Sequence, residues 1–376
     1  MNQPQSYPPL LQSLAWQQLQ QDLGENTFFY QSANYQFLAI QKKTPLGNYL
    51  YLPYGPFIQQ HAKKSSIKKC IDHLLSLAKQ TNAIFIRLEP QISTPHHQTS
   101  HHLLSTFDKK ANVAQYFSLN PKCLKKTKDL NPAETWCLDL TADEKDLLTN
   151  FSQGTRTRHN TYQKKGLTVE VSKNPDDIKY LIKLQHKLAK EKNIATFSEQ
   201  YLKTELKQPF ASLFLVKYYS PTNAKNASVQ NSSQTSNITN IPTDTLPSAP
   251  QKTSKPTPKN GEVIAASLFF DYQDTRFYMQ SAANLDYRHL PATVALLSHA
   301  IFSAKAQGLK NFDFWGIAPL SAKPDHPWYG FTEFKKSFGG YEKTYSGTYD
   351  YILNPQKYLL YQIIRKLNLL KRKLFR

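Results

Sequence analysis

Helical and strand-like patterns alternate along this chain in two series, and the alternation restricts the chain to a mixed α/β fold. In the first 145 or so residues, apolar residues at near-helical spacing predict helices over 11–23 and 67–79. Short apolar and aromatic runs predict strands at 28–30, 35–40, 49–52 and 83–90. Because strands and helices follow one another in this order, we expect a sheet covered by helices.

The second series begins near Phe151 and repeats this organisation. The patterns predict helices over 176–191 and 291–307, and strands at 212–219, 263–272, 275–282 and 311–317. The order of strand pair, helix and strand is that of an acetyltransferase-like (GNAT-type) unit. The residues therefore predict a duplicated α/β architecture whose second unit is acetyltransferase-like.

A segment of different composition interrupts the second series. Residues 220–260 are rich in Ser, Thr, Asn, Pro, Gln and Lys and show no periodic apolar face. Such a segment cannot bury enough apolar surface to fold, so we predict a disordered low-complexity insertion between two strands. A surface loop is the favoured interpretation, and RNA binding is the alternative.

The charge balance is the strongest bulk signal. The 376 residues include 47 Lys and Arg against 27 Asp and Glu, which gives a net charge of +20. An excess of this size favours nucleic acid, phosphorylated precursors or an anionic membrane face as partners. A basic protein that is merely soluble remains the alternative, because net charge carries no information on fold or site.

Cysteine, histidine and leader patterns point to a metal-free protein of the cytoplasm. Cys70, Cys123 and Cys137 form no C-x-x-C pair, so neither a disulfide framework nor a structural zinc site is expected. The histidines of H-H-Q-T-S-H-H (His96–His102) have no acidic or cysteine ligand beside them, and we predict a polar loop there. No signal-peptide pattern and no apolar run of membrane-spanning length is seen, which leads us to expect a cytoplasmic location.

The last predicted helix, 355–374, places leucines and isoleucine at spacings of three and four among many basic residues. Two interpretations are open. The helix can pack its leucines on the first subdomain, which we favour, or 355–376 can contact an anionic membrane face or RNA phosphates.

One turn argues against coenzyme A as the acyl donor. Acetyltransferase-like enzymes hold the coenzyme pyrophosphate on a glycine-rich turn at the start of a helix. Here that turn reads N-L-D-Y-R-H-L-P (Asn284–Pro291), with Arg288 and no glycine. We therefore expect no cofactor.

Five segments together resemble the Fem family of aminoacyl-tRNA-dependent peptidyltransferases. F-D-F-W-G-I is followed by W-Y-G-F-T-E-F-K-K-S-F-G-G and Y-S-G-T-Y-D, while L-P-Y-G-P, R-L-E-P and T-R-T-R-H-N-T-Y-Q-K-K-G-L-T-V lie upstream. The resemblance covers nearly the whole chain outside the insertion. It implies an α/β fold of two acetyltransferase-like (GNAT-type), mixed-sheet subdomains in tandem. The first comprises 1–145, to which 344–376 returns, and the second comprises 146–343.

The resemblance also implies a reaction and a set of residues. Family members transfer an amino acid from aminoacyl-tRNA to a peptidoglycan precursor, nucleotide- or lipid-linked, and Lys335 matches the family's functionally important lysine. Lys335 is thus the expected catalytic residue, and Phe334 and Lys336 beside it are expected to bind tRNA. The expected substrate-binding residues are Tyr54, Arg156, Arg158, Arg288, Trp328 and Tyr329.

Structural alternatives stand beside these expectations. Phe331, Phe334 and Phe338 can be core residues at helical spacing with both lysines solvated, and Arg156 and Arg158 can simply begin a basic surface helix. Two positions depart from the pattern of some relatives, because Gln20 and Thr196–Ser198 stand where a basic residue would bind precursor phosphate.

The predicted protein is a monomeric aminoacyltransferase that forms interpeptide bridges. An acyl-CoA-dependent N-acyltransferase of envelope assembly, or a non-catalytic RNA- or membrane-binding protein on the same fold, are the alternatives.

Overall fold

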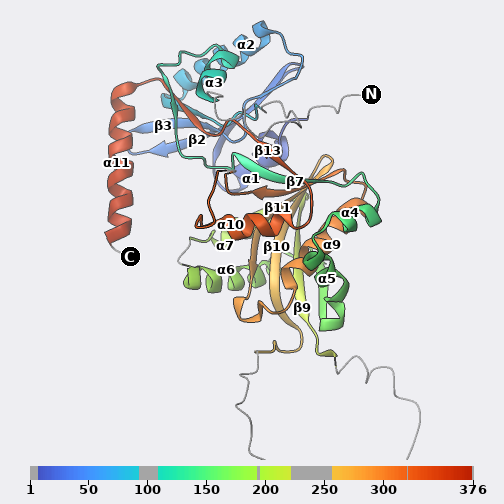
Figure 1. Cartoon of the computed structure of the whole chain (residues 1–376). Coiled ribbons are helices and arrows are strands. Elements are labelled where there is room, and N and C mark those ends of the chain that lie inside the picture. Colours follow the sequence, from blue (N-terminus) through green and yellow to red (C-terminus); the bar gives the residue numbers. More distant parts are fainter. Residues whose placement is uncertain (1–6, 93–108, 193–194, 222–255, 320, 375–376) are drawn as a thin grey trace, which may run out of the picture. The chain divides into compact units, whose positions relative to one another are not determined.

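The computed structural model describes residues 7–92, 109–192, 195–221, 256–319 and 321–374 (Figure 1). The histidine-rich stretch His96–His102 and residues 222–255 of the predicted insertion lie outside the described residues.

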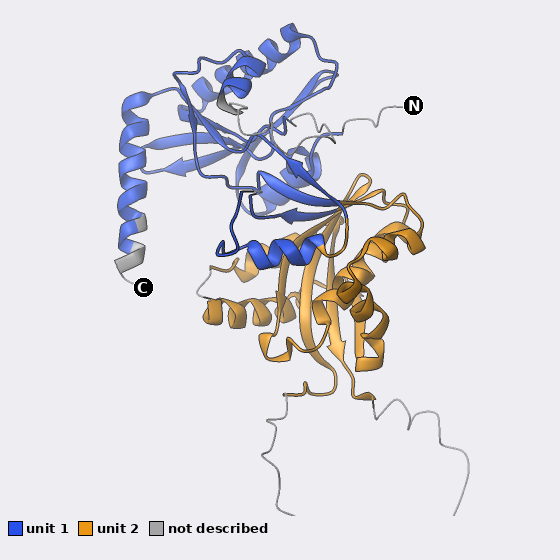
Figure 2. Cartoon of the chain, viewed as in Figure 1, with its two compact units in different colours: residues 1–137, 313–336, 340–376 blue, residues 138–312, 337–339 orange. Residues whose placement is uncertain are grey.

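The chain divides into two compact units, each built from more than one segment (Figure 2). Unit 1 comprises Met1–Cys137, Asp313–Lys336 and Gly340–Arg376; unit 2 comprises Leu138–Phe312 and Ser337–Gly339. The domain limits at 145/146 and 343/344 stay a prediction.

The first sheet belongs to unit 1 and is mixed. Its strand order is β1-β2-β3-β5-β14-β6, with β4 paired to β2. Strands β3 and β5 are parallel, and β14 pairs antiparallel with β5 and β6, so a C-terminal strand lies inside a sheet of N-terminal strands. The strands are β1 (Asn26–Gln31), β2 (Tyr35–Thr44), β3 (Gly47–Leu52), β4 (Phe57–Ile58), β5 (Ala83–Leu88), β6 (Leu124–Lys126) and β14 (Tyr349–Ile352).

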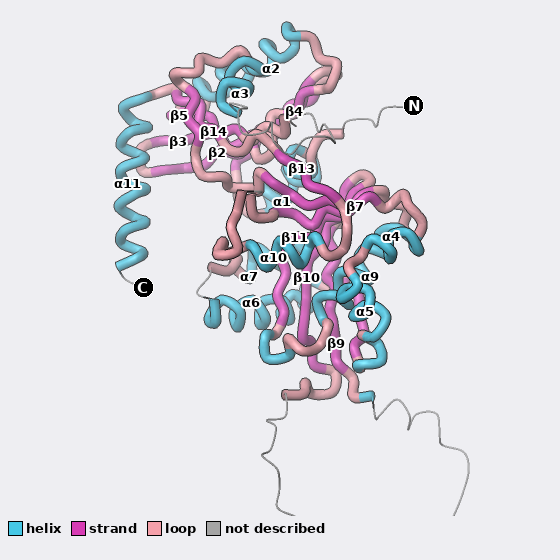
Figure 3. The backbone as a smooth tube through the Cα atoms, viewed as in Figure 1, coloured by secondary structure: helices cyan, strands magenta, loops and turns pink. Residues whose placement is uncertain are grey.

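Helix α2 (Lys64–Gln80) packs on this sheet through its apolar face. Ile67, Ile71 and Leu74 recur at helical spacing on α2 and are buried against Leu50 and Ile86 of the strands. Figure 3 shows the helices and strands along the backbone tube. The helices and 3-10 turns are η1 (Leu10–Gln12), α1 (Leu14–Asp22), α2 (Lys64–Gln80), α3 (Lys109–Phe117), α10 (Tyr329–Lys336) and α11 (Pro355–Leu374).

The second sheet has the strand order β13-β7-β12-β11-β10-β9-β8. Strands β10 and β11 form the predicted hairpin, in which Tyr272 faces Thr275 across the turn Gln273-Asp274. The strands are β7 (Glu134–Asp139), β8 (Leu167–Ser172), β9 (Ala211–Tyr218), β10 (Glu262–Tyr272), β11 (Thr275–Ala283), β12 (Asn311–Gly316) and β13 (Tyr341–Thr344). With two sheets and interspersed helices, the predicted α/β class is confirmed.

Unit 2 has its own aromatic core beside a central helix. The ring centroids of Phe214 and Phe269 lie 4.7 Å apart, and the ring of Phe312 is tilted against that of Phe269 at 6.0 Å. Helix α9 is apolar on nearly every side and buried accordingly. The helices and 3-10 turns here are α4 (Glu144–Asn150), α5 (Gln153–Thr161), η3 (Gln163–Lys165), η4 (Pro175–Asp177), α6 (Ile178–Lys192), α7 (Glu199–Leu206), η5 (Leu285–Tyr287) and α9 (Ala292–Ala306).

Candidate active site around Lys335

Lys335 lies on the last turn of α10, and its side chain is almost entirely buried. Only 1% of the residue is exposed. The helix is held to the segment that follows β12 by Thr332, whose hydroxyl accepts the N–H of Ala318 and donates to the carbonyl of Trp328, each at 2.8 Å. Since Thr332 and Lys335 are three residues apart, they share one face of the helix. This face points the lysine at the end of β12.

The ammonium nitrogen of Lys335 contacts a backbone carbonyl and an aromatic ring. It donates to the carbonyl oxygen of Gly316 at 2.6 Å, and it lies 3.9 Å from the centre of the Phe331 ring. That ring is one helical turn earlier and is 45% exposed, so it stands between the nitrogen and solvent. The alternative of two solvated lysines with Phe331 in the core is therefore wrong for Lys335 and for Phe331. Phe338 alone of the three phenylalanines is fully buried, and it lies beyond the end of α10.

Burial changes the protonation chemistry of this lysine. Desolvation lowers the pKa of Lys335 to about 7, while the charge of Asp313 acts in the opposite direction. At neutral pH the amine therefore exists in comparable amounts of the charged and neutral forms. A group with this property can both donate and take up a proton near physiological pH.

Asp313 is the acidic group of the site. It sits on β12 with 6% exposure, and its carboxylate accepts the N–H of Trp315 at 2.7 Å. Burial raises the pKa of Asp313, although that hydrogen bond and the charges of Lys343 and Lys335 oppose the rise. The result is a buried carboxyl whose charge acts on Lys335.

The end of β12 has an unusual backbone. Trp315 adopts a left-handed φ of +63°, which is rare for a residue with a side chain. Gly316 follows, and a Cβ added there would lie 2.5 Å from Cγ of Pro132. Only glycine fits at this close approach, and its carbonyl is the one that receives the lysine.

Tyr54, a predicted substrate-binding residue, belongs to the same part of unit 1. Its hydroxyl donates to the carbonyl of Pro132 at 2.9 Å, and its ring contacts Trp315 and Tyr345. Burial raises the pKa of Tyr54 well above its ordinary value, so the phenol stays protonated. These contacts support Trp315 and Pro132, which flank Gly316.

The other candidates on α10 and just before it present partly exposed rings and one cation. Trp328 is 48% exposed, and a Cβ on Gly316 would be 3.6 Å from its ring. Tyr329 and Phe334 are half-buried. Lys336 pairs with Glu333 at 3.1 Å and lies over the ring of Trp136.

Three predicted arginines belong to unit 2. Arg156 lies on α5, where it donates to the carbonyl of Thr149 at 2.7 Å, and Arg158, two residues further along the helix, is exposed. Arg288 is exposed and follows η5. The structure thus brings together Lys335, Tyr54, Trp328 and Lys336 in unit 1, and the arginines stand on unit 2.

The S-F-G-G sequence after Lys336 has a structural role in each unit. The backbone N–H of Ser152 donates to the carbonyl of Ser337, and Thr155 donates its hydroxyl proton to the Ser337 hydroxyl at 2.8 Å. Phe338 packs edge-on against Phe151. Gly340, in unit 1, has a φ of +103° and passes so close to the carbonyl of Cys137 that a Cβ would clash at 2.2 Å.

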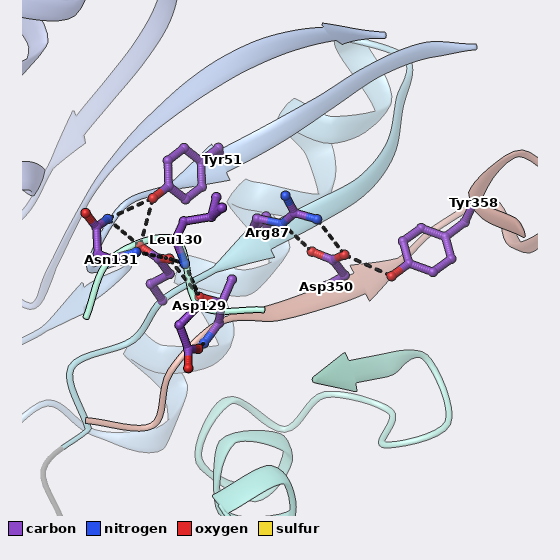
Figure 4. A network of polar contacts seen from close by, with 9 residues as sticks. Tyr51, Arg87, Asp129, Leu130, Asn131, Asp350 and Tyr358 are labelled. Atoms are coloured by element: carbon purple, nitrogen blue, oxygen red, sulfur yellow. Dashed lines mark hydrogen bonds and ion pairs between the residues drawn. The ribbon is translucent and has the colours of Figure 1, made fainter. Parts of the chain in front are cut away.

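A buried ion pair joins the R-L-E-P and Y-S-G-T-Y-D segments (Figure 4). Arg87 on β5 donates to both carboxylate oxygens of Asp350 on β14, at 2.7 and 2.8 Å, and Tyr358 donates to one of them at 2.9 Å. Burial disfavours the charged guanidinium, but the hydrogen bonds and charge of Asp350 raise the pKa of Arg87 above its ordinary value.

Glu89 completes this network beside the ion pair. Its carboxylate accepts hydrogen bonds from the hydroxyls of Tyr51 and Thr348 and from the side chain of Asn131, at 2.7–2.8 Å. The backbone N–H groups of Leu130 and Asn131 also point at it (Figure 4). A charged group buried with this many donors holds segments together.

Comparison with known families agrees with the resemblance seen in the sequence. A model of the FemAB family matches residues 2–214 and 214–366, which is nearly the whole chain. The chain belongs to the FemAB family. Family membership identifies it as a transferase.

The solved structure of FemX has the same fold as this chain. The crystal structure of FemX aligns with a TM-score of 0.70 and 17% identity, covering 95% of this chain and 95% of that chain. The structure of L-PGS from Bacillus licheniformis aligns at 0.49 and 14% identity, over 98% and 99% of the two chains. A tandem GNAT protein from the clavulanic acid biosynthesis pathway aligns at 0.44 and 9% identity, over 85% and 80%. No significant match is found among curated protein sequences.

Within this FemAB-family chain, two groups at the site escaped the sequence reasoning. Asp313 and Gly316 both lie in the quoted F-D-F-W-G-I segment, but neither was chosen as a candidate. The available signal was an acidic residue inside an apolar strand, which is costly unless it has a partner or a role.

The described residues show no group of three or more His, Cys, Asp or Glu that could hold a metal ion. Likewise, no described helix is long and apolar enough to cross a membrane.

Proposed function

We propose that this chain is an aminoacyltransferase that moves an amino acid from aminoacyl-tRNA to the stem-peptide amine of a peptidoglycan precursor. The observation that carries the proposal is Lys335, a buried lysine with a pKa near 7, held against the carbonyl of Gly316 in a FemAB-family chain. Buried titratable groups with strongly shifted pKa values concentrate at functional sites.

The reaction is an acyl transfer from oxygen to nitrogen. The precursor amine attacks the ester carbonyl that joins the amino acid to the terminal ribose of the tRNA, and a tetrahedral oxyanion forms. A carbon–nitrogen bond is made, the carbon–oxygen ester bond breaks, and the amine proton replaces the acyl group on the ribose oxygen. The protein has to stabilise the oxyanion and help move this one proton.

Lys335 suits the first task. In its charged form it is a strong donor for an oxyanion, and in a water-poor site such a donor is worth more than in solution. The carbonyl of Gly316 fixes its direction, and Phe331 limits the access of water to it. A pKa near 7 also lets Lys335 supply or receive the proton that reaches the ribose oxygen.

Asp313 serves as a positioning residue in this proposal. It raises the fraction of Lys335 that is charged, because its carboxylate favours the ammonium form. Through the N–H of Trp315 it also holds the strand end that presents the Gly316 carbonyl.

The exposed rings beside Lys335 suit the end of an RNA chain. Trp328 and Phe331 are each nearly half exposed, and unpaired RNA bases are commonly bound by stacking on aromatic side chains. Phe334 and Lys336 remain the proposed tRNA contacts. Tyr54, Trp328, Tyr329, Arg156, Arg158 and Arg288 remain the proposed substrate-binding residues.

The acyl-CoA alternative is less well supported by the turn at 284–291. Arg288 is exposed there, the side chain of Asn284 accepts the backbone N–H of Asp286, and no glycine gives the backbone room for a pyrophosphate. A non-catalytic binding protein would have no need of a destabilising buried lysine.

The test is a transfer assay with purified full-length protein. tRNA charged with labelled Gly, Ala or Ser is incubated with a precursor that carries a free stem amine, and labelled acyl-CoA is supplied in a parallel reaction. We expect label to pass from tRNA to the precursor. Lys335→Ala should reduce the rate at least about a hundredfold, the usual cost of losing an oxyanion donor.

Lys68→Ala is the matched control, because Lys68 is an exposed lysine of unit 1 on α2. It should transfer at the wild-type rate. Label that moves only from acyl-CoA, or transfer that survives in Lys335→Ala, would overturn the proposal.

A further inference from the structure

Helix α11 carries an apolar stripe that the described part of the chain leaves uncovered. Five large apolar residues on it are exposed, at 64, 45, 46, 52 and 56% for Leu359, Leu360, Ile363, Leu367 and Leu370. At 100° per residue, these side chains fall within about a third of the helix circumference and form one continuous stripe along roughly three turns. Single exposed apolar residues are ordinary, but a continuous stripe marks a contact surface.

The opposite side of α11 is the side that packs on unit 1. Tyr358 is 4% exposed, its ring meets Phe85 edge-on at 5.2 Å, and its hydroxyl is hydrogen-bonded to Asp350. Tyr361, three residues further along the helix, also contacts Phe85 and Tyr49. The expectation that the leucines pack on the first subdomain is therefore wrong, because two tyrosines occupy that contact and turn the leucines outward.

Cations border the stripe on both sides. Lys366 falls on one side of the stripe by helical position and Lys371 on the other, and both are exposed. The sequence 355–374 contains six Lys and Arg and no Asp or Glu. A helix with an apolar stripe, basic flanks and no acidic residue is typical of one that lies in the plane of a membrane interface.

We propose that α11 docks on the surface of an anionic phospholipid bilayer, with its leucine stripe among the acyl chains and its lysines at the phosphates. Charge decides between possible occupants. A second copy of α11 would bring like charges against each other, and RNA phosphates would leave the leucines in water. An anionic lipid surface satisfies the stripe and the cations together. The inference does not depend on the proposed transfer reaction.

The test measures binding of the full chain to vesicles by co-sedimentation. Vesicles of phosphatidylcholine alone are compared with vesicles that also contain phosphatidylglycerol, at low and at high salt. We expect the protein to sediment with the anionic vesicles, to bind the neutral ones at least about tenfold more weakly, and to lose part of its binding as salt rises.

Two double variants separate the apolar from the ionic contribution. Ile363→Ser with Leu367→Ser should reduce binding to anionic vesicles about tenfold or more, since both side chains would otherwise enter the bilayer. Lys366→Glu with Lys371→Glu should remove the preference for anionic lipid. The control is Leu14→Ser, an equally exposed leucine on α1, which should bind as the wild type does.

Because the substituted side chains are exposed, these variants should fold, and circular dichroism with thermal unfolding checks that they do. Wild-type binding by the stripe variant would overturn the proposal. The proposal would also be overturned if the wild-type protein were a dimer that the stripe variant dissociates. A third contradicting result would be that, in the absence of lipid, the stripe variant loses RNA binding as strongly as it loses vesicle binding. None of these measurements requires catalysis, so failure here is distinguishable from failure of the transfer assay.

Discussion

Unit 1 buries two cations in opposite ways, at the β5–β14 pair and at the end of β12. Arg87 meets Asp350 through two hydrogen bonds, and its pKa rises. Lys335 is equally buried but donates to a carbonyl, and its pKa falls to about 7.

The difference shows what each burial achieves. A guanidinium with a bidentate carboxylate keeps its charge and fastens two segments that lie more than 250 residues apart in sequence. Desolvation brings the buried lysine close to losing its proton, which costs stability. The first region is built for cohesion, and the function proposed above assigns reactivity to the second.

The largest effect is expected where the ion pair is broken. Arg87→Met leaves the carboxylate of Asp350 buried without its cation, which should lower the free energy of unfolding by about 3–5 kcal/mol. Urea denaturation followed by circular dichroism measures this change. Lys68→Met, at an exposed lysine, is the control and should change the free energy of unfolding by less than about 0.5 kcal/mol. A small effect of Arg87→Met would mean that the pair does not hold β14 in the sheet.

Substitution of Lys335 is expected to change the free energy of unfolding in the opposite direction. The pKa of Lys335 is about 7 in the folded protein and near 10.5 when unfolded, so the unfolded chain binds more protons between these values. Stability from this group therefore rises as pH increases from 7 to 10.5 and is lowest below pH 7. Lys335→Met should raise the free energy of unfolding at pH 6 by on the order of 2–4 kcal/mol and abolish transfer.

Urea titrations repeated at alkaline pH test whether the increase in the free energy of unfolding comes from the buried charge. As the pH approaches the unfolded pKa, the advantage of Lys335→Met should shrink toward zero. A variant that is less stable than the wild type at pH 6 would show that Lys335 is a structural cation like Arg87.

A smaller effect is expected from the carboxyl beside the lysine. Asp313→Asn removes the charge that favours the ammonium, so the pKa of Lys335 should fall further below 7. Nuclear magnetic resonance titration of labelled lysine side chains follows this pKa directly. Transfer should decline at neutral pH and recover in part at lower pH, because fewer molecules carry the charged donor. An unchanged lysine pKa would remove Asp313 from the proposed mechanism.

The smallest effect concerns the ring that covers the lysine. Phe331→Ala should let water reach the nitrogen and raise the pKa of Lys335 toward its ordinary value, although losing the ring also removes a favourable contact of about 1 kcal/mol. The same titration measures the net change. Phe197→Ala, at a comparably exposed ring outside α10, is the matched control and should leave the pKa as it is.

Much of the architecture followed from local patterns in the sequence. The helix at 67–79 and the hairpin around Gln273-Asp274 were predicted because apolar periodicity and turn residues act over a few positions. The five quoted segments were sufficient to indicate the family, and the match over nearly the whole chain confirms it. Lys335 was identified by its position in one of those segments, and its role stays a prediction.

Contacts between distant segments could not be predicted in this way. The sequence contains Arg87 and Asp350, but nothing local shows that β14 enters the sheet beside β5 and brings them together. The importance of Asp313 was missed for the same reason, since its effect depends on a lysine 22 positions later that α10 turns toward it.

By itself, then, the sequence determined the α/β class, the positions of most elements and the family, because these depend on short-range patterns of apolar residues and on motif order. Only the tertiary structure decided which lysine is buried and which face of α11 is free. Both depend on long-range packing. The hydrogen bonds of Thr332 and Gly316 hold the side chain of Lys335 in the interior. Tyr358 and Tyr361 pack against Phe85, so the leucines of α11 face outward.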